Sequence, residues 1–125
     1  MRSQGIALYP FVPSGSDFKL AIEFFGELGF GRLWQENGIA GLRFGGAYFN
    51  LQDIDAPEWQ KNQMITFEVD DLDLYWSEVE AKALPLRFPG AKLRPPTEFA
   101  WGREIHIIDL GGVCWHVRQS RSASP

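Results

Sequence analysis

The sequence has few of the residues that build disulfides or metal sites. It contains one cysteine, Cys114, and two histidines, His106 and His116. A single cysteine cannot form a disulfide within the chain, which fits a reducing compartment. No apolar run approaches the roughly 20 residues that a transmembrane helix needs, and residues 1–4 lead into no signal-like apolar core. We therefore expect a cytoplasmic protein that does not bind membranes.

Basic residues are also scarce relative to acidic ones. The chain has 12 Lys and Arg against 16 Asp and Glu, which gives a formal net charge of −4. A molecule of this charge repels nucleic acid and attracts cations, so we expect no nucleic-acid partner. Aromatic residues are plentiful instead, because 5 Trp and 10 Phe in 125 residues supply flat apolar surface that can grip ring systems.

The first half of the chain has the pattern of one strand, one helix and three strands. Residues 5–12 are apolar and extended, and Ser16 or Asp17 can cap the helix that follows. Gly29 is placed to end this helix. Its apolar face repeats at spacings of three and four and consists of Phe18, Ala21, Ile22, Phe25 and Leu28. Strands are expected at 31–36, 39–44 and 47–52, separated by Asn-Gly and Gly-Gly turn signals.

The second half repeats that order after a polar link at 53–61. A strand at 63–69 leads to a cap at Asp70 or Asp71 and to a helix that Pro85 closes. The apolar face of this helix consists of Leu72, Tyr75, Trp76, Val79 and Ala83. Extended segments are expected at 86–92, 103–109 and 113–119. The segment 93–101 carries two prolines and is expected to be a loop.

This doubled order predicts the fold class. We expect an α+β protein of two βαβββ modules, at about 5–52 and 63–119, whose curled mixed sheets surround a cleft. The length fits a single domain over residues 1–119. The remaining residues, 120–125, are small and polar and are expected to form a disordered tail.

Three stretches resemble the bleomycin-resistance branch of the glyoxalase/bleomycin-resistance/dioxygenase superfamily, also called the vicinal oxygen chelate fold. Residues 21–25 with 28–30 resemble its first helix, and residues 67–73 resemble the entry to its second helix. The third stretch, 100–106 continuing into 109–117, resembles its closing hairpin. The tetrapeptide Trp101-Gly102-Arg103-Glu104 is its most specific piece. The resemblance covers nearly the whole chain except the tail and implies the paired βαβββ fold.

The enzymes of this superfamily hold a divalent metal with four side chains, and the resemblance implies that most of these ligands are missing here. The first strand offers none, and Met64 stands where the second module usually carries histidine, with Gln63 as the nearest substitute. His116 stands where the enzymes carry their closing Glu. It either binds a metal or is a hydrogen-bonded histidine lining an apolar cleft. We interpret Cys114 as an unreactive packing residue rather than as an activated nucleophile.

We also expect the two histidines to lie on opposite faces of the closing hairpin. If Ile108 pairs with Val113 across the Gly-Gly turn, His106 falls beside Trp115 and away from His116. A site with two histidines would then be excluded. The prediction is a cleft with no metal, no cofactor and no catalytic residue.

The resemblance implies a ligand-binding cleft instead. Drugs of the bleomycin type combine flat heteroaromatic rings with a cationic tail, so their receptor needs stacking faces and negative charge. We expect the ligand-binding residues to be Trp34, Ile39, Gln52, Trp59, Thr66, Trp101 and His116. Trp101 is the foremost candidate for covering a ligand; the alternative is a tryptophan of the core or of a dimer interface.

Two of these positions depart from the drug-binding pattern. Ile39 and Thr66 stand where the resistance proteins place aromatic side chains toward the ligand. Each missing stack weakens binding by about 0.5 to 1.5 kcal/mol, which argues against bleomycin itself as the natural ligand. Trp59 either substitutes from a neighbouring subunit or is an exposed loop tryptophan.

The resemblance further implies a homodimer, because the clefts of these proteins lie between subunits. Pro10 matches a proline at which the first strand crosses to the partner, and a strand proline permits this exchange without requiring it. We expect non-catalytic binding and sequestration of a small molecule, such as a bleomycin-family glycopeptide, by aromatic stacking in an acidic cleft. The alternative is a metal-dependent lyase, isomerase or dioxygenase that uses His116 with unusual partners.

Overall fold

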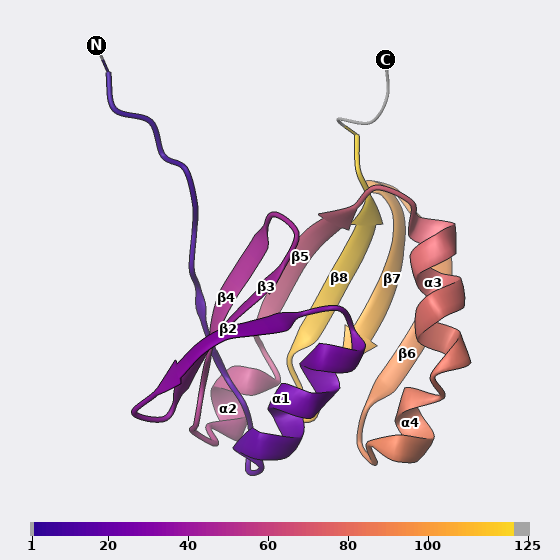
Figure 1. Cartoon of the computed structure of the whole chain (residues 1–125). Helices are drawn as coiled ribbons and strands as arrows, with labels where there is room; N and C mark the ends of the chain where they lie inside the picture. Colours follow the sequence, from indigo (N-terminus) through magenta and orange to yellow (C-terminus); the bar gives the residue numbers. More distant parts are fainter. Residues whose placement is uncertain (1, 122–125) are drawn as a thin grey trace.

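Two four-stranded sheets form the framework of the computed structural model, which describes residues 2–121 (Figure 1). The first sheet has the strand order β1-β4-β3-β2 and the second has the order β5-β8-β7-β6. In each sheet the first strand of a module runs parallel to the last strand, and the other neighbours are antiparallel. The structure thus confirms two βαβββ modules in an α+β fold.

The first module follows the prediction from its helix onward. Its elements are β1 (Phe11–Pro13), α1 (Phe18–Glu27), β2 (Gly31–Glu36), β3 (Ile39–Phe44) and β4 (Ala47–Gln52). Helix α1 begins after Asp17, whose carboxylate accepts a hydrogen bond from the backbone N–H of Leu20 at 3.0 Å. It ends before Gly29, whose φ of +112° only glycine adopts easily.

Residues 2–10, here called the N-terminal arm, differ from the predicted strand at 5–12. The arm extends away from the body of the molecule without strand pairing, and the side chains of Ile6 and Leu8 are 95% and 80% exposed (Figure 1). It joins the sheet near its end, where the backbone N–H of Asn50 donates to the carbonyl of Pro10 at 2.8 Å. A strand needs a hydrogen-bonded neighbour, and residues 2–121 supply none for most of the arm.

The second module and the link before it contain seven elements. They are α2 (Pro57–Gln60), β5 (Met64–Val69), α3 (Leu72–Ala81), α4 (Leu84–Arg87), β6 (Lys92–Phe99), β7 (Gly102–Ile108) and β8 (Cys114–Gln119). Strands β5, β7 and β8 lie within one residue of their predicted bounds. Asp71 caps α3 as expected, since its carboxylate accepts from the backbone N–H of Leu74.

The prediction was wrong between the second helix and β7. The expected strand at 86–92 begins instead with the short helix α4, in which Pro85 occupies the first turn, where its missing N–H costs nothing. The expected loop at 93–101 is mostly strand β6. The two prolines of β6 lie at an irregularity between Arg94 and Thr97 on the edge of the sheet, where strand proline is tolerated.

The predicted tail at 120–125 lies partly outside the described residues, which exclude 122–125. The backbone N–H of Ser120 donates to the carbonyl of Val69 at 2.8 Å, and Nη2 of Arg121 donates to the carbonyl of Trp101 at 2.9 Å. Within residues 2–121, no helix has the length and apolar character needed to cross a membrane.

One hydrophobic core joins the two modules. The rings of Phe25 in α1, Phe49 in β4 and Trp115 in β8 meet with centroid distances of 4.9 to 5.2 Å. Trp115 and Val117 of β8 both point into this core and are buried. Because side chains alternate along a strand, His116 between them points to the opposite face of the second sheet.

Candidate functional site

Both histidines lie on that opposite face, which we call the outer face of the second sheet. In the hairpin of β7 and β8, Ile108 pairs with Cys114 and His106 pairs with His116, whose ring centroids are 4.2 Å apart. The predicted pairing of Ile108 with Val113, and the exclusion of a two-histidine site that followed from it, were therefore wrong.

The register differs because residues 109–113, rather than the expected 109–112, separate the paired ends of the two strands. The carboxylate of Asp109 accepts hydrogen bonds from the backbone N–H groups of Gly111 and Val113 at 2.9 and 3.0 Å. It also accepts one from the indole N–H of Trp115 at 2.8 Å. Asp109 thus holds a wider turn, and the shift of one residue moves His106 to the other face of the sheet.

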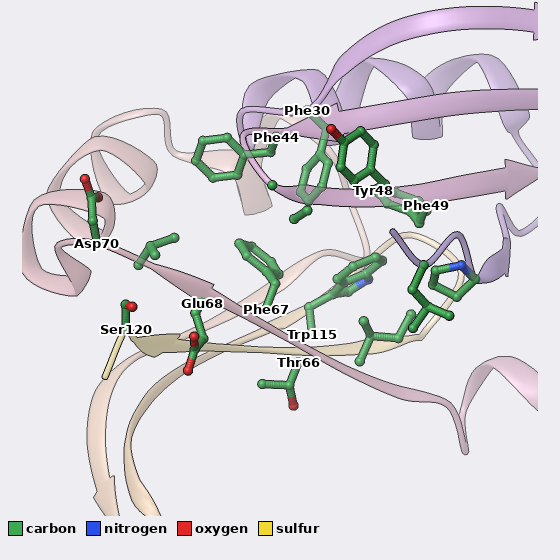
Figure 2. Close-up of a pocket in the computed structure, with 16 residues that line it drawn as sticks. Phe30, Phe44, Tyr48, Phe49, Thr66, Phe67, Glu68, Asp70, Trp115 and Ser120 are labelled. Atoms are coloured by element: carbon green, nitrogen blue, oxygen red, sulfur yellow. The ribbon is translucent and has the colours of Figure 1, made fainter. Parts of the chain in front are cut away.

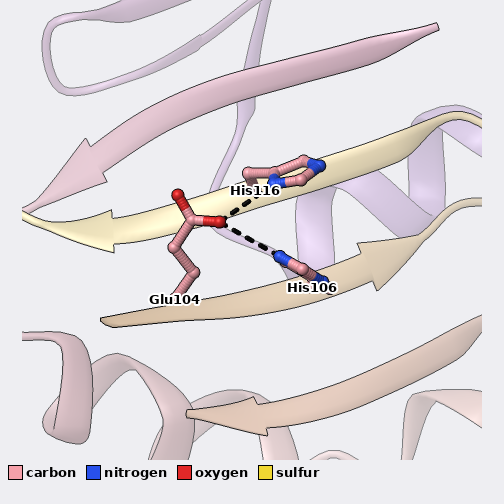
Figure 3. Close-up of side chains that lie close together, drawn as sticks. All are labelled: Glu104, His106 and His116. Atoms are coloured by element: carbon pink, nitrogen blue, oxygen red, sulfur yellow. Dashed lines mark hydrogen bonds and ion pairs between the residues drawn. The ribbon is translucent and has the colours of Figure 1, made fainter. Parts of the chain in front are cut away.

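Glu104 of β7 joins the two histidines (Figure 3). Its Oε1 atom lies 3.1 Å from Nε2 of His106 and 2.9 Å from Nδ1 of His116. Its Oε2 atom accepts two hydrogen bonds from the guanidinium of Arg118, at 2.5 and 3.0 Å. The carboxylate is fully buried on the outer face, and the side chain of Trp101, in the turn before β7, also hydrogen-bonds to it.

The environment of Glu104 decides its charge. Burial acts to raise the pKa of its carboxyl, but hydrogen bonds from His116, His106 and Arg118 outweigh burial and lower the pKa to about 2. Glu104 is the last residue of the Trp-Gly-Arg-Glu motif, and the sequence alone assigned it no role. The signal was its distance of two residues from His106, which places both on one face of a strand.

Cys114 lies on the same outer face and is partly buried. Burial raises the pKa of its thiol, and the charges of Asp109 and Glu104 raise it further. A raised thiol pKa lowers the fraction of reactive thiolate at neutral pH.

A row of stacked rings leads from the histidines to the edge of the second sheet. The ring of Phe99, at the end of β6, stacks on His106 at 4.9 Å with an interplanar angle of 17°. It also stacks on Trp101, in the turn before β7, at 5.0 Å and 8°. Trp101 is 51% exposed. Its half-open indole therefore extends an ordered aromatic surface toward solvent.

Three of the predicted ligand-binding residues share one face of the first sheet. Ile39 of β3 pairs with Gln52 of β4, and Trp34 of β2 pairs with Gly41, which is on the same face as Ile39. Gly41 has no side chain, and the indole of Trp34 occupies the space that its Cβ would fill. Trp34, Ile39 and Gln52 therefore belong to one surface, on which the indole lies against β3 at Gly41.

The remaining two candidates lie in different surroundings. Trp59 of α2 is exposed and lines a cavity of about 360 Å³ with Gln52 and Phe11. Thr66 of β5 borders a cavity of about 550 Å³ between the two modules, but its side chain points away from the aromatic rings there (Figure 2). It pairs with His116 and so belongs to the outer face of the second sheet.

Six of the seven predicted site residues thus fall into two groups within one chain, and Trp59 lies outside both, on α2. Trp34, Ile39 and Gln52 lie on the first sheet, while Thr66 and His116 lie on the second, with Trp101 at its edge.

The residues do not fit the four-ligand metal site of the superfamily's enzymes. The N-terminal arm carries no metal-ligating side chain at residues 6–10, and Met64 begins β5 at an exposed position. His116 remains from that set, and its partners Glu104 and His106 come from β7.

Comparison with solved structures gives close matches over the whole fold. The bleomycin-binding protein from Streptomyces verticillus, complexed with copper(II)-bleomycin, superposes with a TM-score of 0.81 at 22% identity, covering 96% of this chain and 100% of that one. A bleomycin resistance determinant encoded on the transposon Tn5 gives a TM-score of 0.78 at 20% identity, covering 96% and 99% of the two chains.

A fosfomycin resistance protein, FosX from Listeria monocytogenes, complexed with Mn(II) and sulfate, gives a TM-score of 0.68 at 14% identity, covering 96% of this chain and 92% of that one. No protein-family model matches the sequence, and no curated protein matches it. At these identities the likeness shows the fold, which is the glyoxalase/bleomycin-resistance fold.

Proposed function

We propose that this protein binds and sequesters a flat, cationic small molecule without chemical turnover, as a member of the bleomycin-resistance branch of its fold. The row of stacked rings formed by Trp101, Phe99 and His106 is the observation that carries this proposal. A ligand ring placed on the open face of Trp101 would extend this stack. Because the three side chains are already ordered, little side-chain entropy is lost on binding.

Charge supports a cationic ligand. The formal net charge of −4 draws cations toward the molecule, and Glu68 is exposed on the outer face, where it pairs with Arg118 in the register of β5 and β8. The solved structures of similar fold include proteins complexed with bleomycin, which carries both flat rings and a cationic tail.

We further propose that the ligand lies between two copies of the chain. The two groups of site residues lie on different sheets of one chain, so a homodimer can bring the Trp34 group of one copy against the Trp101 group of the other. The N-terminal arm is suited to exchange because Ile6 and Leu8 are exposed, and β5 is an edge strand with one side unpaired within residues 2–121. The chain has a single cysteine and so cannot form an internal disulfide, which fits our proposal that this dimer works in the reducing cytoplasm.

Isothermal titration with metal-free bleomycin tests the proposal. We expect saturable binding with a Kd below about 100 µM, and a Trp101→Ala variant that binds roughly 3- to 10-fold more weakly because one stacking face is lost. Leu86→Ala removes an exposed apolar side chain from α4, and this variant should bind as the unmodified chain does. Equal affinities of all three proteins would exclude Trp101 as the stacking platform.

Ile39 and Thr66 stand where the resistance proteins place aromatic side chains, so we expect a modest affinity for bleomycin. Ile39 is half-buried on β3 and Thr66 is exposed on β5, and neither offers a ring to a ligand. An Ile39→Phe or Thr66→Phe substitution should therefore strengthen bleomycin binding by up to about 1 kcal/mol if the ligand rings reach these positions.

A further inference from the structure

Glu104, His106 and His116, here called the Glu-His-His cluster, place three potential metal ligands together (Figure 3). One ligand atom from each side chain lies within 4.8 Å of the other two. Glu104 Oε1 faces both rings, at 3.1 Å from Nε2 of His106 and 2.9 Å from Nδ1 of His116. Arg118 holds the other carboxylate oxygen, so the orientation of Glu104 does not depend on the histidines alone.

The spacing of these atoms suits a metal ion. Zinc binds imidazole nitrogen and carboxylate oxygen at about 2.0–2.2 Å, so two ligands of a tetrahedral ion lie about 3.3 Å apart. The two oxygen–nitrogen distances in the cluster are within a few tenths of an ångström of that value. Two imidazoles and one carboxylate are a donor set that divalent transition metals prefer over calcium or magnesium.

The protonation of the two imidazoles and their exposure to solvent are also compatible with a bound ion. An ion between the three side chains replaces the two shared protons, and each neutral ring then carries its proton on its other nitrogen. For His116 that nitrogen, Nε2, is buried and has no hydrogen-bond partner in the part of the chain that the structure describes. Nε2 is the atom that must carry the proton of a neutral His116 when Nδ1 binds an ion. Both imidazoles are partly exposed on the outer face, which gives an ion a route in.

We propose that Glu104, His106 and His116 bind one divalent transition-metal ion, zinc above all, and leave its fourth position open to the outer face. Two of the three ligands come from β7, so this is a different set from the four ligands of the superfamily's enzymes. It also differs from the metal-free cleft that the sequence predicted. The proposal is independent of small-molecule binding, because three protein atoms hold the ion without a ligand.

Metal titration of the full chain, dialysed against EDTA and then freed of it, tests the site. We expect one Zn²⁺ per chain by isothermal titration, and a visible absorption band when Co²⁺ takes the same place in a four-coordinate site. His106→Gln and His116→Gln should each weaken binding by roughly tenfold or more. Neither titration contains a small-molecule ligand, so their outcome is separate from that of the bleomycin experiment.

Glu68→Gln is the matched control, since it removes a carboxylate from the same outer face but outside the cluster. It should leave Zn²⁺ binding unchanged. Circular dichroism of each variant shows whether it folds. If His116→Gln does not fold, His106→Gln provides the test of the site. The proposal is overturned if the unmodified chain takes up no stoichiometric Zn²⁺, or if a folded histidine variant binds it as tightly.

Discussion

Two buried carboxylates in the hairpin of β7 and β8 have opposite pKa shifts because their partners differ. Glu104 receives hydrogen bonds from an arginine and two histidines, and these lower the pKa of its carboxyl to about 2 against the effect of burial. Burial raises the pKa of Asp109 to about 6, since its hydrogen bonds from Trp115 and from backbone N–H groups only partly oppose it. The negative charge of Glu104 is stabilised at neutral pH, whereas that of Asp109 is destabilised by burial.

Asp109 should make the protein less stable as pH rises. Its pKa is raised above the value of the unfolded chain, so the native state binds the extra proton between pH 4 and 6. The free energy of unfolding should therefore fall by on the order of 3 kcal/mol as pH rises through this range. In Asp109→Asn this contribution is absent. Urea unfolding at about pH 4.5 and pH 7.5 should show the stability advantage of the unmodified chain shrinking at the higher pH.

A difference between the two proteins that stays constant across this pH range would contradict the assigned role of Asp109. Other titrating groups are common to both chains and cancel in the comparison. The loss of the indole hydrogen bond in the variant adds about 1 to 3 kcal/mol at both pH values and does not change the trend.

The same residue explains what sequence reasoning missed at the site. The alternation of β7 and β8 was predictable, and so was the position of each histidine on its strand. Their relative face was not, because a Gly-Gly pair predicts a tight turn and gives no sign that Asp109 accepts hydrogen bonds from two backbone groups of a longer one. One residue of register separates a lone histidine from the Glu-His-His cluster.

At the scale of elements, local signals decided which predictions succeeded. Helices α1 and α3 carry a capping aspartate and a periodic apolar face, and β2, β3 and β4 are bounded by glycine turns. Strand β6 was missed because proline argues against a strand, and only the position of β6 at the sheet edge makes its prolines tolerable. The place of a strand at the sheet edge depends on how all the strands assemble, and the residues of that strand alone do not reveal it.

The short helix α2 also depends on a distant contact. Gln60, at its end, is buried and accepts a hydrogen bond from the backbone N–H of Ala56 at 2.5 Å. Its amide donates to Asp55 Oδ1 at 3.2 Å and to the carbonyl of Gly111 at 2.7 Å, in the turn between β7 and β8. Gln60 thereby ties the link between the modules to the hairpin that carries the site.

Gln60→Ala should lower the free energy of unfolding by about 1 to 3 kcal/mol, because it leaves buried backbone groups without partners. Asn62→Ala is the control, since it removes only the side-chain hydrogen bond from exposed Asn62 to the carbonyl of Glu58 and should cost less than about 0.5 kcal/mol. Urea unfolding measures both. Equal losses in the two variants would show that the Gln60 bridge does not stabilise the fold.

At the scale of the whole molecule, our proposal of a homodimer depends on two open surfaces. The N-terminal arm exposes Ile6 and Leu8, and the two groups of site residues occupy different sheets. The sequence resemblance implied the exchange of the first strand through Pro10, and we propose that the unpaired arm is the segment exchanged. Exchange would bury the exposed apolar side chains of the arm against the partner.

Removal of residues 2–9 should therefore convert a dimer into a monomer. Size-exclusion chromatography with light scattering should give twice the chain mass for the full sequence and a single chain mass for the shortened one. An Ile6→Ala, Leu8→Ala double variant keeps the length of the arm and should weaken the dimer through lost apolar burial. A full-length chain that elutes as a monomer, or a shortened chain that remains dimeric, would rule out exchange of the arm.

We propose above all that the molecule binds its ligand and releases it chemically unchanged. The most direct measurement is calorimetric titration of the metal-depleted full chain with metal-free bleomycin, followed by mass spectrometry of the recovered drug. We expect saturable binding at micromolar concentrations, with the Kd below about 100 µM, and a recovered drug of unaltered mass. No binding at high micromolar concentrations would contradict sequestration of drugs of this class, and a drug of altered mass would show that the protein is an enzyme.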